Sequence, residues 1–271
     1  MKKRLIAISL SVISLMLIVG CGFFFHQTNR DTITIGRSTL KEIKSTDNNS
    51  NIISHGMRTE FDLKKILTGD NYTYNTYVFS GTVQDIKLYE VSWTDENGEE
   101  WGPFTRTILS VKINKEYTGS ASSENGIVRV LTTEVLSAER EDTVKINIGD
   151  TYIFVNCWSL DDKYFGYISE NDPISYKNDI SLQQADVIMG GTWNSVFPVE
   201  NNAVMVYHEY FENNTDVLQK KLSASSINSD KFVSSESILN DEYIVLNVAD
   251  FEKSFSALLD DIGTSTQAET K

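Results

Sequence analysis

The chain has 271 residues, with 24 Lys and Arg against 38 Asp and Glu, and a formal net charge of −14. An acidic surface of this kind repels nucleic acid and anionic lipid headgroups, so we expect no nucleic-acid partner. Hydrophobic residues make up 40% of the chain and aromatic residues 11%, which is enough for a packed core. The length indicates one large domain, or one domain with an extension.

The N-terminus has the pattern of a secretory signal. A basic start at residues 2–4 precedes an apolar run over residues 5–19, and Ile18-Val19-Gly20-Cys21 ends it. The run is shorter than the roughly 20 residues that a membrane-spanning helix needs. This pattern resembles a bacterial lipoprotein signal peptide, and its last four residues resemble a lipobox.

The resemblance implies a signal peptide over residues 1–20, cleavage between Gly20 and Cys21, and a lipid on Cys21. Two acyl chains on that cysteine are enough for stable anchoring. The protein would then be attached to the cell membrane on its extracytoplasmic face. The alternative is an uncleaved N-terminal anchor, which also leaves the rest of the chain outside the cytoplasm.

We expect residues 21–58 to contain the lipidated cysteine and a flexible tether, since residues 45–51 are polar and lack a period. Within this segment, Thr32-Ile33-Thr34-Ile35 has the alternation of a short strand. Residues 59–67 predict a short helix, with Thr59 as its cap and Gly69 after its end.

From residue 77 the hydrophobic pattern changes to a period of two, with turn residues between short segments. Such spacing predicts a mainly β domain, a sandwich or a barrel, which we assign to residues 59–212. Gly81 lies inside the first long strand, where a glycine often marks a bulge or a sharp bend. The segments that carry a further resemblance are Ser80-Gly81-Thr82-Val83, residues 107–119, residues 148–154 and Val196-Phe197-Pro198-Val199.

These segments resemble extracytoplasmic OB-fold domains of bacterial lipoproteins, which look like the OB-fold of tissue inhibitors of metalloproteinases. The resemblance implies an OB-like β-barrel and supports a fold more than a function. Inhibitors of that type use a free N-terminal cysteine on zinc. That mechanism is not carried over, because Cys21 would be acylated and the resemblance, which covers roughly residues 70–212, begins some fifty residues later.

Residues 213–271 form the predicted C-terminal extension. Its clearest element is an amphipathic helix over residues 250–262, with Asp250 as its cap. The apolar stripe of this helix consists of Phe251, Phe255, Leu258, Leu259 and Ile262. We expect the stripe to pack on the barrel, and the alternative is that it binds a groove of a partner protein.

Trp93 and Trp101 flank an acidic segment that contains Asn97-Gly98, a strong signal for a β-hairpin turn. We expect a solvated hairpin tip with the two tryptophans paired across the strands. Two alternatives are a ligand-binding platform made of Trp93 and Trp101, and a calcium site made of the carboxylates. The spacing of an EF-hand loop is absent.

Other candidates for chemistry are few. Cys157 is expected to be a buried, apolar thiol within a strand. The three histidines are not at metal-ligand spacing, so we predict no metal site and no cofactor. No motif of a hydrolase nucleophile, a zinc protease, a phosphate loop or a dinucleotide site is present.

The sequence therefore favours a lipid-anchored extracytoplasmic protein that acts as a non-catalytic binding or interaction module of the cell envelope. One alternative is an immunity or inhibitor lipoprotein that captures a cationic peptide or enzyme, steered by the acidic surface. The other is a hydrolase whose site is assembled from residues scattered along the chain.

Overall fold

A computed structural model describes residues 31–43, 76–121, 123–133, 144–190, 195–211, 219–232 and 243–257. These residues form a mainly β protein with one ten-stranded sheet, in the order β1-β2-β3-β4-β5-β7-β6-β8-β9-β10. The strands are β1 Thr32–Ile35, β2 Ser38–Ile43, β3 Thr76–Thr94, β4 Glu100–Thr118, β5 Ile127–Thr132, β6 Thr151–Ser159, β7 Val187–Met189, β8 Val196–Glu200, β9 Ala203–Tyr207 and β10 Tyr243–Asn247.

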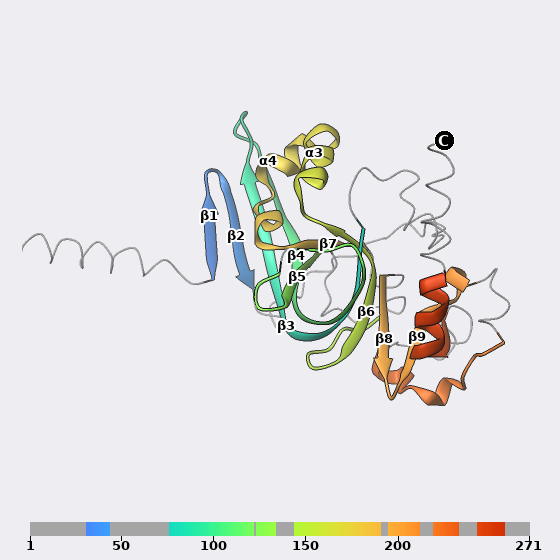
Figure 1. Cartoon of the computed structure of the whole chain (residues 1–271). Coiled ribbons are helices and arrows are strands. Elements are labelled where there is room, and N and C mark those ends of the chain that lie inside the picture. Colours follow the sequence, from blue (N-terminus) through green and yellow to red (C-terminus); the bar gives the residue numbers. More distant parts are fainter. Residues whose placement is uncertain are drawn as a thin grey trace, which may run out of the picture.

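Five of these strands form a ring. β3 pairs with β4, β4 with β5, β5 with β7, β7 with β6, and β6 pairs again with β3 (Figure 1). All of these pairings are antiparallel except β5 with β7, which is parallel. Because β3 pairs with β4 on one edge and β6 on the other, its first half belongs to the ring.

β3 has a β-bulge or irregularity against β4 at Gly81, where the sequence predicted a bulge or a sharp bend. The register with β4 shifts between Ser80 and Gly81. A Cβ at Gly81 would collide with the Val111 side chain and lie 2.8 Å from the carbonyl O of Lys112. Only a residue without a side chain allows the two strands to approach this closely.

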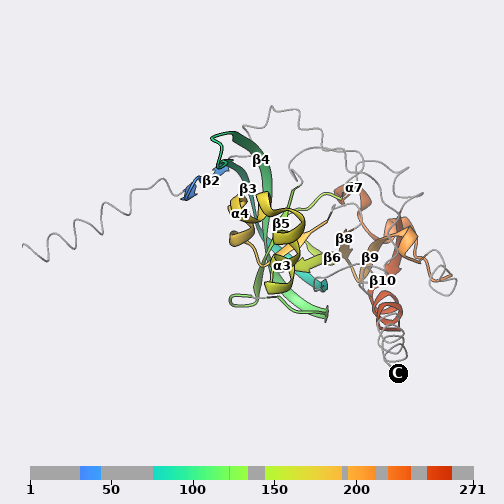
Figure 2. The same cartoon turned by 90° about the horizontal axis from the view of Figure 1, so that it is seen from above.

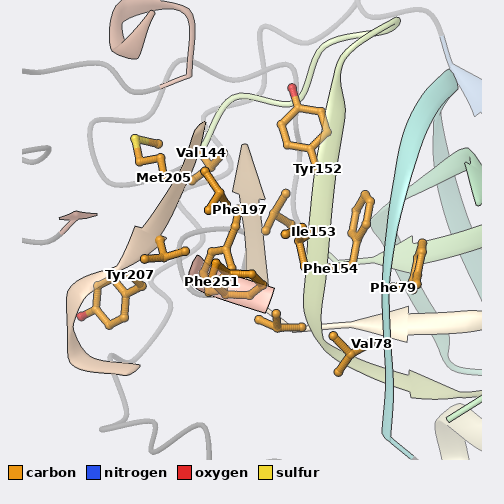
Figure 3. Packing of buried hydrophobic residues seen from close by; sticks show 14 of the residues in the cluster. Val78, Phe79, Val144, Tyr152, Ile153, Phe154, Phe197, Met205, Tyr207 and Phe251 are labelled. Atoms are coloured by element: carbon orange, nitrogen blue, oxygen red, sulfur yellow. The ribbon is translucent and has the colours of Figure 1, made fainter. Parts of the chain in front are cut away.

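The main core consists of buried residues of the ring and of the C-terminal strands, and Figure 3 shows part of it. Phe79 of β3 stacks on Phe154 of β6, with ring centroids 4.9 Å apart. Phe197 of β8 meets Phe251 edge to face at 6.1 Å. β6 is buried on both faces over residues 152–157, which explains its almost continuous apolar sequence.

The C-terminal segment belongs to this same core. β10 pairs with β9 along its whole length, and Phe232, Phe251 and Phe255 are fully buried. The boundary predicted at residue 212 therefore does not separate two cores. Residues 248–257 are helical, and the remaining stripe residues Leu258, Leu259 and Ile262 lie outside the described residues.

The N-terminal segment departs from the expected tether. β1 and β2 form a hairpin, and β2 pairs with the outer half of β3 from Ser38–Trp93 to Ile43–Leu88. The short strand expected over residues 32–35 is confirmed as β1. The prediction of a flexible tether is wrong for residues 32–43, since their backbone continues the sheet. Gly20, Cys21 and the helix predicted over residues 59–67 lie outside the described residues. Within the described ranges, no helix is long and apolar enough to cross a membrane.

The helices lie at two ends of the sheet. α3 Asp162–Asn171, α4 Pro173–Asn178 and η2 Ile180–Gln184 connect β6 to β7. Figures 1 and 2 show α3 and α4 beside the β3–β4 hairpin, away from β9. The short elements η3 His208–Phe211, η4 Ala224–Ser226 and α7 Ser229–Phe232 lie in the C-terminal part.

Glu252 attaches the helical residues 248–257 to β4. Its carboxylate accepts a hydrogen bond from the Tyr117 hydroxyl at 2.9 Å and pairs with Lys115 Nζ at 2.8 Å. Partial burial opposes ionisation of Glu252, but the bonds from Lys115 and Tyr117 outweigh it and lower the pKa of Glu252.

We expect Glu252→Gln to lower the free energy of unfolding by about 0.5–1 kcal/mol, since the pair is partly exposed. The lowered pKa means that this contribution is complete above the ordinary glutamate value of 4.5 and is lost as pH falls through the folded-state pKa. The measurement is urea unfolding of wild type and variant from pH 7 to pH 3. Glu124→Gln, at an exposed position, is the control, and an equal effect of both variants would contradict the contact.

Candidate functional site

The tip of the β3–β4 hairpin is built around Asp95. Its Oδ1 accepts hydrogen bonds from the backbone N–H groups of Asn97 at 2.8 Å and Glu99 at 2.9 Å. Gly98 has a φ of +86°, which a glycine adopts without strain. The backbone bond from Glu99 is the largest of the contacts that lower the pKa of Asp95. The hairpin predicted from Asn97-Gly98 is confirmed.

The structure confirms that Trp93 and Trp101 are partners across the hairpin, but their environments differ. Trp101 is 38% exposed, whereas Trp93 is only 5% exposed. Trp93 packs in a small buried cluster with Leu40, Val91 and Ile180. Trp93 therefore supports this surface. Of the two tryptophans that the sequence offered as a ligand-binding platform, only Trp101 is accessible.

A third aromatic residue, Phe104, packs against Trp93. Its ring centroid lies 5.0 Å from that of Trp93, and 37% of Phe104 is exposed. We call Trp101 and Phe104, with Trp93 beneath them, the hairpin platform. Phe104 is three residues from Trp101, so regular alternation would put the two side chains on opposite faces of the strand.

A β-bulge at Gly102 brings them to the same face. The register shifts between Val91, which is opposite Phe104, and Trp93, which is opposite Trp101. Gly102 has a φ of +97°, and a Cβ there would lie 2.6 Å from the carbonyl O of Val91. The sequence analysis missed both Gly102 and Phe104. The signal that could have found them is a glycine followed by a proline at the start of a strand.

η2 and the residue before it cover the inner part of this face. Arg106 donates from Nε and Nη2 to Asp179 Oδ2 at 3.0 and 2.7 Å, and both side chains are largely buried. Asp179 Oδ1 accepts from the backbone and hydroxyl of Ser181. This pair holds η2 over β2 and β3, and it aligns the Arg106 guanidinium 5.8 Å from the Phe104 ring.

α4 lies next to the hairpin tip. Lys177 Nζ lies 3.6 Å from Glu96 of the hairpin tip, and Ile174 and Tyr176 of α4 are exposed. Tyr176 also contacts the Phe165 ring at 6.3 Å. The Lys177–Glu96 contact therefore brings a helix from a distant part of the chain next to the hairpin tip.

The remaining candidates do not join this site. Cys157 is buried in β6 as predicted, and burial raises the pKa of its thiol. His208 begins η3 after β9. Among the described residues, no three His, Cys, Asp or Glu side chains gather as a metal ligand set. A ligand at the platform would therefore contact aromatic rings and the carboxylates of the tip.

We expect Gly102→Ala to destabilise the protein by about 1–3 kcal/mol, because the added methyl group meets the Val91 carbonyl at a strained φ. The change should also alter the near-ultraviolet circular dichroism of the tryptophans. Gly98→Ala is the matched control, since Gly98 also has a positive φ but has no atom within 4 Å of an added Cβ. Equal losses in the two variants would contradict the close approach at the bulge.

A scan against protein-family models, a search of curated proteins and a search of solved structures each found no match to this chain.

Proposed function

We propose that this protein is a lipid-anchored, non-catalytic binding module on the extracytoplasmic face of the cell membrane, and that its partner docks on the hairpin platform. The observation that carries the docking proposal is the exposed pair of rings on a rigid hairpin. Aromatic side chains contribute much of the binding energy at protein interfaces, and a bulge, a capped turn and a buried ion pair hold these two in position.

We further propose an OB-like build for the ring of strands. Numbered along the chain, the ring has the order first, second, third, fifth, fourth, with the fourth strand paired to the first and a parallel pair between the third and fifth. This order resembles an OB-fold and supports the proposal. Ligands of OB-folds bind on the second and third strands and the loops between strands one and two and between four and five.

The platform occupies corresponding positions. Residues 95–99 join the first and second strands of the ring, and α3, α4 and η2 join the fourth and fifth. The Lys177–Glu96 pair brings the two connections within contact. The likeness in position supports docking at this end of the ring.

The lipid anchor rests on the N-terminal pattern and is tested at Cys21. We expect Cys21→Ser to lose labelling by a palmitate analogue and to leave the membrane fraction, because the acyl chains provide the anchoring free energy. Metabolic labelling and fractionation of cells measure both. Cys157→Ser is the control and should keep the label, since Cys157 is buried. Unchanged labelling of Cys21→Ser would contradict lipidation at this residue.

Docking is tested by site-specific crosslinking in cells. We expect a photoreactive phenylalanine at position 104 to form a protein adduct, and Trp101→Ala in the same chain to reduce the adduct several-fold, because it removes the neighbouring ring. The control is the same probe at Ile148, which is strongly exposed. The turn that contains Ile148 is hydrogen-bonded to Val83 through its next two residues. Val83 is ten residues from Trp93 along β3, so this control position is roughly 30 Å from the platform.

Adduct formation at position 148 with the same efficiency, or an adduct at 104 that does not respond to Trp101→Ala, would refute docking on the platform.

A further inference from the structure

The hairpin platform is surrounded by negative charge. Its tip, residues 95–100, carries four carboxylates in six residues, and Glu96, Glu99 and Glu100 are exposed. Asp95 Oδ2 lies 3.4 Å from Trp101 Nε1, so the indole is held beside these carboxylates. We propose that the docking partner presents a basic peptide segment, with a Lys or Arg side chain on the Trp101 ring and its charge near Glu99 and Glu100. This inference rests on the proposed function and names the partner's chemistry.

The first argument is that a ring and carboxylates attract the same ligand group. A cation is attracted to the face of an indole and to a carboxylate, whereas an anion is repelled by both. The platform itself contains an internal example, since the Arg106 guanidinium lies 5.8 Å from the Phe104 ring. Across the described residues, Trp101 has no cation on its ring. A cation of the partner would lie over the Trp101 ring as Arg106 lies over the Phe104 ring.

The second argument concerns the two cations that already touch the tip. Arg37 Nη1 donates to the backbone carbonyl O of Asp95 at 2.9 Å. Lys177 lies 3.6 Å from Glu96, and the two side chains are 64% and 89% exposed. Exposed pairs of this kind contribute little. A basic side chain of the partner can therefore displace Lys177 at small cost.

The third argument is charge complementarity over the whole molecule. The formal net charge of −14 steers a basic segment toward the protein and repels an acidic one. An acidic peptide, a nucleic acid or an anionic membrane on this face would have to approach Glu96, Glu99 and Glu100. The rings supply contact area, and the carboxylates select the sign of the partner's charge.

The test uses the full-length lipidated protein in detergent micelles and two ten-residue peptides, one alternating Lys and Ser and the other Glu and Ser. Binding is followed by calorimetry at low and physiological salt. We expect only the basic peptide to bind, with affinity that falls as salt rises. Trp101→Ala should weaken it about three- to five-fold and Trp101→Phe less, because a ring remains.

Charge variants distinguish binding at the platform from attraction to the acidic surface as a whole. Glu99→Gln/Glu100→Gln should weaken binding several-fold, and Lys177→Gln should strengthen it, because Glu96 becomes free. Glu124→Gln/Asp230→Asn removes two exposed carboxylates elsewhere and is the matched control. Thermal unfolding of each variant establishes that it is folded, and Ile148→Ala serves as the control for loss of an exposed apolar side chain.

Equal weakening by the hairpin and control charge variants, or no effect of Trp101→Ala, would overturn the inference, since attraction would then be general. Binding of the acidic peptide, or of neither peptide, would also overturn it. An adduct at position 104 that depends on Trp101 would in that case leave the docking proposal standing with a partner of different chemistry. If the basic peptide does not bind and position 104 gives no adduct that depends on Trp101, the proposed function is refuted as well.

Discussion

The structure depends on the pairing of β3 with two different strands. Over residues 76–82, β3 pairs with β6 and closes the ring, and from residue 88 to 93 it pairs with β2 and extends beyond it. The 19-residue strand can do both because β6 and β2 pair with different lengths of the same edge, while β4 pairs with the other edge. The close approach of β3 and β4 at Gly81 lies in the half that belongs to the ring. The half of β3 that pairs with β6 thereby belongs to the core. The half that pairs with β2 extends beyond the ring, and we call it the arm.

The arm has to bury its own apolar face, because the main core does not reach it. Ile33, Leu40, Val91 and Phe104 lie in one cross-strand row over β1 to β4. η2 covers the middle of the row through Ile180, and the Arg106–Asp179 pair holds it there. The ends of the row remain accessible, so the exposed rings result from incomplete coverage by a short helix. The proposed docking surface thus lies at the end of the arm.

Much of the candidate site could be predicted locally. Asn97-Gly98 determines a tight turn, and the turn makes Trp93 and Trp101 partners, since register follows from the turn in a hairpin. The difference in their exposure could not be predicted, because it depends on Ile180, nearly ninety residues away in sequence. Phe104 was missed for a local reason: alternation assigns it to the opposite face, and the bulge at Gly102 reverses that assignment.

The sequence by itself determined the mainly β character, the irregularity at Gly81, the hairpin tip and the buried state of Cys157, because alternation, turn chemistry and glycine geometry act over a few residues. Tertiary structure decided which distant segments share the sheet. Local alternation indicated β1 at residues 32–35, and the apolar stripe indicated that Phe255 is buried. The pairing of β2 with β3 and of β10 with β9 was decided by the tertiary structure, because short strands gain order from the edge of a neighbouring strand, which no local pattern specifies.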